Sequence, residues 1–205
     1  MVQSLDQLKE TPSQTAGPYV HIGCTPIFSG ITGVYEEDLG TRMVNEKTKG
    51  ERITVRGHVY DGTGTPLRDA LIEIWQADAD GLYPSPAETR GTADPNFTGW
   101  GRSPGDMETG EFVFHTVRPG AVPYPDGRTM APHISFWIVA RGINLGLHTR
   151  MYFPDDLAAL KADPMLSRVE HQVRVPTLVA KKTGPAEYSF DIHLQGSNET
   201  IFFDI

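Results

Sequence analysis

Short runs of alternating apolar and polar residues, separated by turns, most limit what this chain can fold into. Residues 52–60 alternate with the period of a half-buried strand, and residues 61–66 follow as a turn. Only residues 155–161 have the apolar spacing of a helical turn. Further strands are expected at residues 70–76, 111–117, 133–139, 148–153, 188–194 and 200–203. Many short strands without regular helices between them predict an all-β protein, an antiparallel β-sandwich with long loops.

The first 50 residues lack this alternation and are expected to contain an extended N-terminal arm. Residues 5–10 are expected to form a short polar helix, which must end before Pro12. The segment after it has too many Pro and Gly residues for a helix or a central strand. An arm of this length is either disordered or held by something, and its apolar residues favour an arm that is held, for example by another chain. We therefore divide the chain into residues 1–50, the arm and irregular segment, and residues 51–205, the sandwich.

The composition excludes several classes of function. Lys and Arg number 18 against 26 Asp and Glu, and the formal net charge of −8 argues against nucleic acid as a partner. A single cysteine, Cys24, excludes an internal disulfide framework. No apolar stretch approaches the ~18 residues of a membrane span. The first residues lack the basic and apolar regions of a signal peptide, so a soluble, cytoplasmic protein is expected.

Two positions near the 133–139 strand offer groups that bind metals. His133 and Ser135 share one face of that strand, but serine is a poor ligand for a transition metal. By themselves these residues favour a structural histidine. Tyr124 lies in the preceding loop, where a bound cation would favour its phenolate form. Its simpler interpretation is a loop tyrosine that packs its ring.

Five segments of the chain carry motifs that can be recognised together. They are residues 57–62, 71–83, 94–97, 116–120 and 131–134. These motifs resemble the intradiol ring-cleavage dioxygenases, occur in the order of that family and span roughly residues 50–205. More narrowly, four further segments resemble the alpha chain of the two-chain members of the family, namely residues 11–23, 139–144, 147–150 and 199–204.

The resemblance implies a β-sandwich whose catalytic chains hold non-haem Fe(III) through two tyrosines and two histidines. The ligand positions that carry over are Tyr124 and His133, while the second histidine falls on Ser135. The other tyrosine should lie in residues 87–93, which contain none. Too few donors remain to hold a metal by geometry. We therefore expect a vestigial site, no cofactor in this chain, and Fe(III) on a partner chain.

The same resemblance gives this chain a role in a shared substrate pocket. It implies a hetero-oligomer with a homologous, iron-binding beta chain, acting in aromatic catabolism. The substrates are then 3,4-dihydroxybenzoate and O2, and the product is 3-carboxy-cis,cis-muconate. We expect no catalytic residue in this chain alone, which is inactive by itself. The substrate-binding residues implied are Thr15, Gly17, Pro18, Tyr19 and Arg141.

Two other functions are compatible with the same residues. The first is a self-sufficient intradiol dioxygenase with a rebuilt iron site that uses His133, Tyr124 and other donors. The second is a non-enzymatic β-sandwich binding module, which would also lack the ligands. Metal analysis of the isolated chain separates the first from an alpha chain, and co-purification of an iron-bearing homologue would eliminate the second.

Overall fold

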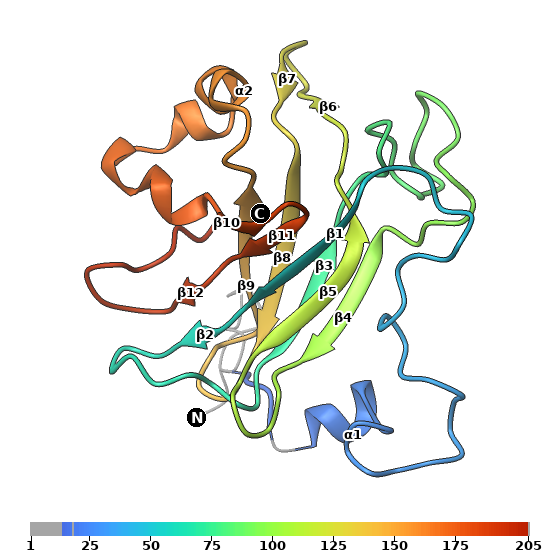
Figure 1. Cartoon of the computed structure of the whole chain (residues 1–205). Helices are drawn as coiled ribbons and strands as arrows, with labels where there is room; N and C mark the ends of the chain where they lie inside the picture. Colours follow the sequence, from blue (N-terminus) through green and yellow to red (C-terminus); the bar gives the residue numbers. More distant parts are fainter. Residues whose placement is uncertain (1–13, 18, 205) are drawn as a thin grey trace, which may run out of the picture.

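Two facing β-sheets form the body of the protein, as Figure 1 shows for the computed structural model, which describes residues 14–17 and 19–204. One sheet has the strand order β10-β11-β1-β5 and the other has the order β4-β3-β8-β9. The main strands are β1 (Arg52–Gly57), β3 (Leu71–Trp75), β4 (Trp100–Pro104), β5 (Phe112–Val117), β8 (His133–Val139), β9 (Leu147–Tyr152), β10 (Lys181–Gly184) and β11 (Glu187–Ser189). This arrangement confirms the predicted sandwich.

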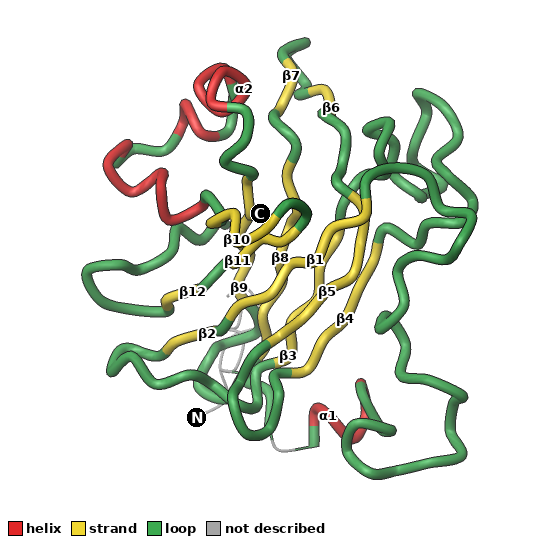
Figure 2. The backbone as a smooth tube through the Cα atoms, in the orientation of Figure 1, coloured by secondary structure: helices red, strands yellow, loops and turns green. Residues whose placement is uncertain are grey.

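Two small pairs of strands and a few short helices complete the fold (Figure 2). The small pairs are β2 (Val59–Tyr60) with β12 (Ile192–His193), and β6 (Val122–Pro123) with β7 (Thr129–Met130). Most neighbouring strands are antiparallel, but β1 with β11 and β2 with β12 are parallel. The helices are α1 (Val20–Cys24), α2 (Leu157–Ala162) and two 3₁₀ helices, η1 (Leu166–Arg168) and η2 (Gln172–Leu178). None of the described helices is both long and apolar enough to cross a membrane.

The core between the sheets follows from the alternation in each strand. Alternate residues of a strand point to opposite faces, so one half of each run is buried. Phe136 of β8 lies at the centre, with its ring centroid 5.9 Å from that of Phe112 and 5.3 Å from that of Phe190. The inward side chains of β1, β3, β5 and β8 are Ile53, Val55, Ile72, Ile74, Phe112, Phe114, Ile134, Phe136 and Ile138. The other face of β3, β8 and β9 is thereby turned outward.

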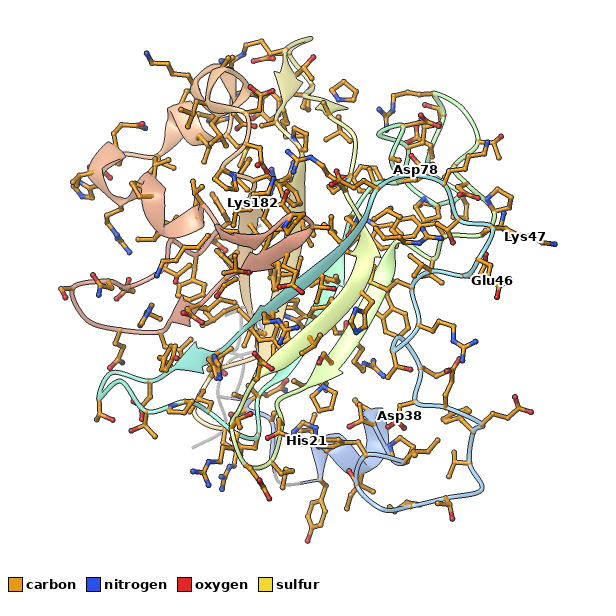
Figure 3. The ribbon with its side chains drawn as sticks, viewed as in Figure 1. His21, Asp38, Glu46, Lys47, Asp78 and Lys182 are labelled. Atoms are coloured by element: carbon orange, nitrogen blue, oxygen red, sulfur yellow. The ribbon has the colours of Figure 1, made fainter. Side chains whose placement is uncertain are left out.

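A buried carboxylate fixes the long loop that follows β3. Asp78, labelled in Figure 3, accepts hydrogen bonds from the backbone N–H groups of Asp80 and Leu82 at 3.0 and 2.9 Å and of Asp94 at 2.8 Å. Gly81 beside it has φ of 80°, and a Cβ there would lie 2.2 Å from the carbonyl oxygen of Ala121. Only glycine allows this conformation and approach. The loop after β3 and the loop after β5 are therefore packed together.

Some sequence expectations fail in the structure. The expected strand at 200–203 is wrong, since this segment forms only an isolated bridge between His148 and Phe203. Strands β4 and β10 and helix α1 lie where loops or irregular structure were expected. The helix expected at residues 5–10 lies outside the described residues.

Candidate functional site

The outward face of β3, β8 and β9 carries the two expected metal-ligand positions of the 133–139 strand. Strand register places Ser135 of β8 directly beside Trp75 of β3 on one side and Arg150 of β9 on the other. His133, two residues earlier, pairs with Tyr152 of β9, and their ring centroids are 5.6 Å apart. The structure thus brings His133 and Ser135 onto one face, as their spacing predicted.

His133 is held as a neutral, structural histidine. Its side chain is buried, with 4% of the residue exposed, and its Nδ1 donates to the carbonyl oxygen of Ala131 at 2.8 Å. Ala131 in turn donates its N–H to the carboxylate of Asp163 at 2.8 Å. Burial, together with the positive charge of Arg150, lowers the pKa of His133 from 6.5 to about 4. The imidazole is therefore uncharged at neutral pH.

Ser135 faces an arginine in place of a second metal ligand. The Nε of its cross-strand neighbour Arg150 is buried and has no hydrogen-bond partner in the described part of the chain. The hydroxyl of Tyr152 is also buried without a hydrogen-bond partner among the described residues. Burial raises the pKa of Tyr152 well above its usual value, and the Asp163 carboxylate adds to this effect. This tyrosine therefore stays protonated and is no phenolate ligand.

Tyr124 lies in the turn between β6 and β7, half-buried against a small apolar cluster. Its hydroxyl accepts a hydrogen bond from the Nη1 of Arg168 at 2.6 Å. Residues 87–93, where the family's other tyrosine would lie, instead hold an ion pair between Glu88 and Arg90, which lowers the pKa of Glu88 to about 2. Tyr83, nearby, stacks on Trp75 with ring centroids 5.8 Å apart.

These residues do not fit a four-ligand iron site. Two of the four ligand positions are lost, and the hydroxyl of Tyr124, one of the two that survive, accepts a hydrogen bond from Arg168. Over residues 14–17 and 19–204, no three His, Cys, Asp or Glu side chains gather closely enough to hold a metal ion. The groups gathered here are mainly guanidinium and hydroxyl hydrogen-bond donors. Such groups stabilise the fold and supply positive charge, but a guanidinium has no lone pair to give to a metal.

His133 should make folding sensitive to mild acid. The folded chain keeps the pKa near 4 and the unfolded chain near 6.5, so the unfolded state alone binds a proton between these values. The contribution of His133 to the free energy of unfolding is then fully present above pH 6.5. It falls by about 3 kcal/mol as the pH drops towards 4. Urea unfolding of wild type and His133→Asn at pH 7.5 and 4.5 checks this. The variant should lose less stability between the two pH values, and equal losses would contradict the assignment.

In the assembled protein His133→Ala should act on stability and not on turnover. Removing the imidazole orphans the Ala131 carbonyl, which costs roughly 1–3 kcal/mol. Iron content and turnover number should stay close to wild type, because His133 has no second ligand beside it. Thermal unfolding, elemental analysis and steady-state kinetics of the variant measure all three. Loss of iron from the variant would show that His133 is a ligand after all.

A second group of expected residues meets where the N-terminal arm lies against the loop after β8. The hydroxyl of Thr15 donates to the carbonyl oxygen of Ala140 at 3.1 Å and accepts from the N–H of Gly142 at 3.0 Å. Gln14 adds bonds to Leu145 and Asn144, both at 2.7 Å. The arm is therefore attached on both sides of Arg141. Thr15 and Arg141, far apart in sequence, are neighbours in the fold.

The remaining arm residues are exposed or lie outside the described residues. Gly17 is exposed, and, its chain neighbours apart, no heavy atom of the described residues lies within 4 Å of a Cβ built there. The side chain of Tyr19, at 77% exposure, projects into solvent. Pro18 lies outside the described residues.

Arg141 is positioned by a residue that the sequence analysis missed. Its Nε donates to the carboxylate of Asp69, and its side chain remains 66% exposed. The carbonyl oxygen of Asp69 also contacts the Nε2 of His21 at 3.1 Å, and His21, labelled in Figure 3, comes from α1. Asp69 thus contacts both His21 of helix α1 and Arg141. No local pattern around residue 69 could have revealed this, because the three residues meet only in the fold.

Comparisons with known proteins identify the family. The profile of a family described as Dioxygenase matches residues 24–196. The chain belongs to the intradiol ring-cleavage dioxygenases. A solved intradiol ring-cleavage dioxygenase from Tetranychus urticae shares its fold. The two align with a TM-score of 0.57 at 21% identity, over 82% of this chain and 94% of that one. The dioxygenase domain of a carbohydrate-binding fusion protein from Streptomyces sp. SirexAA-E aligns with a TM-score of 0.53 at 27% identity, over 92% of this chain and 100% of that one.

Among curated relatives, the chain is similar to both subunits of one enzyme. It is 42% identical to the protocatechuate 3,4-dioxygenase alpha chain of Pseudomonas putida, over 98% of each chain. It is 35% identical to the protocatechuate 3,4-dioxygenase beta chain of Burkholderia cepacia, over 82% of this chain and 75% of that one. The resemblance to the alpha chain extends through the whole length, including the arm.

Proposed function

We propose that this chain is the alpha subunit of a protocatechuate 3,4-dioxygenase. In this role it shapes the substrate pocket of a homologous beta chain that holds Fe(III). The complex then cleaves 3,4-dihydroxybenzoate with O2 between the two hydroxyl-bearing carbons and forms 3-carboxy-cis,cis-muconate. The chain itself contributes binding and charge, and the metal of the partner chain supplies the redox chemistry.

The attachment of the arm beside Arg141 is the observation that carries the proposal. Thr15 bonds to the backbone at residues 140 and 142, so the arm and the guanidinium form one surface. Asp69 uses the Nε of Arg141, which leaves its terminal nitrogens available to a substrate. Guanidinium donors suit a carboxylate such as that of 3,4-dihydroxybenzoate. Gly17 is exposed, and without a side chain it lets a ligand approach the backbone closely. Tyr19 is exposed as well and offers a flat ring.

Exposed apolar side chains support a protein partner. Clusters of such side chains on a protein surface mark interaction sites. More than half of the large apolar side chains exposed in the described part of the chain lie between residues 19 and 39, and they are Tyr19, Ile22, Phe28, Ile31, Val34, Tyr35 and Leu39. This segment is continuous with the arm, so a beta chain that covers it would also face Arg141.

Co-purification tests the proposal against its two alternatives. A tagged copy of the chain, expressed in its native host, should retain a homologous chain in equal amount. That partner should carry a His-x-His pair, both tyrosines and iron, and the complex should consume 3,4-dihydroxybenzoate and O2. A tagged chain that has its own iron and full activity without a partner would instead be a self-sufficient dioxygenase. A chain with neither iron nor such a partner would be a binding module.

A further inference from the structure

Two arginines lie beside the two metal-ligand positions that survive in this chain. Arg168 donates from its Nη1 to the Tyr124 hydroxyl at 2.6 Å. Arg150 faces Ser135 across β8 and β9, and its positive charge is one of the causes of the low pKa of His133. Each surviving ligand position therefore has an arginine in its surroundings, in addition to the loss of the other two ligands.

The surroundings of Arg150 leave its charge without a direct counter-ion. No carboxylate oxygen in the described part of the chain lies within 4.0 Å of its guanidinium nitrogens, a distance at which ten other pairs form. Its Nη1 points at the sulfur of Met130, 3.5 Å away, and its Cζ lies 5.9 Å from the centroid of the Phe203 ring. Its Nε is buried and unpaired. A partly buried cation without a direct ion-pair partner thus occupies the face on which His133 and Ser135 lie, and the Asp163 carboxylate opposes its effect on His133 only in part.

We propose that Arg150 excludes metal ions from this position by its fixed positive charge, independently of the missing ligands. Restoring the second histidine alone would then leave the chain unable to bind a metal tightly. The inference rests on the family resemblance, which puts two metal-ligand positions at residues 133 and 135, and not on the alpha-subunit role. It assigns to Arg150 a function that the loss of ligands does not explain.

The physical reason lies in charge and dielectric. Repulsion between like charges grows as water is removed from between them. A guanidinium cannot escape this repulsion by releasing its proton, whereas a histidine or a lysine can shift its pKa. A divalent cation held by residues 133 and 135 would therefore always meet the charge of Arg150. Neutralising residue 150 should be worth on the order of 100-fold in metal affinity.

A set of variants built on Ser135→His separates charge from ligand loss. Ser135→His supplies the His-x-His pair, and Arg150→Gln, Arg150→Lys or Arg150→Met is then added to it. Co²⁺ is the probe, titrated into the full-length chain at pH 7. Bound cobalt is counted by elemental analysis above the wild-type preparation. Circular dichroism and thermal unfolding establish that each variant is folded, and Arg150→Met replaces Arg150→Gln if the latter is not.

The proposal predicts one tight Co²⁺ per chain in Ser135→His combined with a neutral residue 150, about 100-fold tighter than in Ser135→His alone. Ser135→His with Arg150→Lys should gain less affinity than the variants with a neutral residue 150, because a lysine must first release its proton to remove its charge. A control, Ser135→His with Arg42→Gln, removes an exposed arginine paired with Glu37 far from the site and should gain nothing. Tight binding by Ser135→His alone would overturn the proposal. So would equal affinities of the neutral and the lysine variants.

Discussion

Replacing Arg141 by alanine is expected to lower kcat/KM for 3,4-dihydroxybenzoate by roughly 10- to 100-fold in the assembled enzyme. The guanidinium is exposed, and its Nε alone is used by Asp69. A charge-assisted hydrogen bond to a substrate carboxylate contributes roughly 1.5–3 kcal/mol, and 1.4 kcal/mol corresponds to a factor of ten. The chain has a net charge of −8, so a local cation matters for attracting an anionic substrate.

Substrate and variant controls make this prediction specific. Plain catechol has no carboxylate, so its turnover should fall much less in Arg141→Ala. Arg141→Lys should recover part of the loss, because a point charge does not reproduce the planar fork of donors. Arg56→Ala removes the same charge from β1 of the other sheet, where Arg56 pairs with Glu111, and should behave as wild type. Equal losses for both substrates would mean that Arg141 supports the pocket without reading the carboxylate. Steady-state kinetics with iron content held constant decide the matter.

Deleting residues 1–19 is expected to raise KM at least about tenfold, or to release the partner, while the sandwich still folds. In the described part of the chain every member of the main core cluster lies at Met43 or later, so the deletion takes none of these side chains away. It does remove the two hydrogen bonds of Thr15 and the exposed Tyr19. Each hydrogen bond contributes about 0.5–1.5 kcal/mol, and the loss of the pocket wall adds to this.

The matched control is the deletion of residues 1–13, which leaves Gln14 and Thr15 in place. Size-exclusion chromatography, thermal unfolding and kinetics of both deletions measure assembly, folding and substrate binding separately. The shorter deletion should stay closer to wild type in KM. If the longer deletion keeps both wild-type KM and wild-type size, the arm has no part in the pocket.

The sequence predicted the strands that alternate and missed those that do not. Strands β1, β3, β5 and β8 have buried residues at every second position, and the expected ranges match them within a few residues. Strand β4 contains Gly101 and Pro104 and shows no alternation of apolar residues. Strand β10 is a polar edge strand with three of its four residues exposed. Both are held by their neighbours, which periodicity along a single segment cannot detect.

The candidate site divides in the same way. Spacing alone placed His133 and Ser135 on one face, and the family resemblance singled out Thr15 and Arg141. Arg150 and Asp69 were missed. Arg150 matters because the register of β8 and β9 sets it opposite Ser135, and Asp69 because it contacts both Arg141 and α1. Contacts of this kind depend on the tertiary fold, and no local pattern in the sequence encodes them.

Iron content, counted chain by chain, tests the central claim most directly. In the proposed function this chain completes a pocket around iron that a partner chain holds. Its own iron site lacks two ligands, because residue 135 is a serine and residues 87–93 contain no tyrosine. The chain purified alone should contain no stoichiometric iron and show no tyrosinate-to-iron charge-transfer absorption. The complex should contain one iron per pair of chains, together with that absorption. One tightly held ferric ion in the isolated chain, with the same colour, would contradict the account.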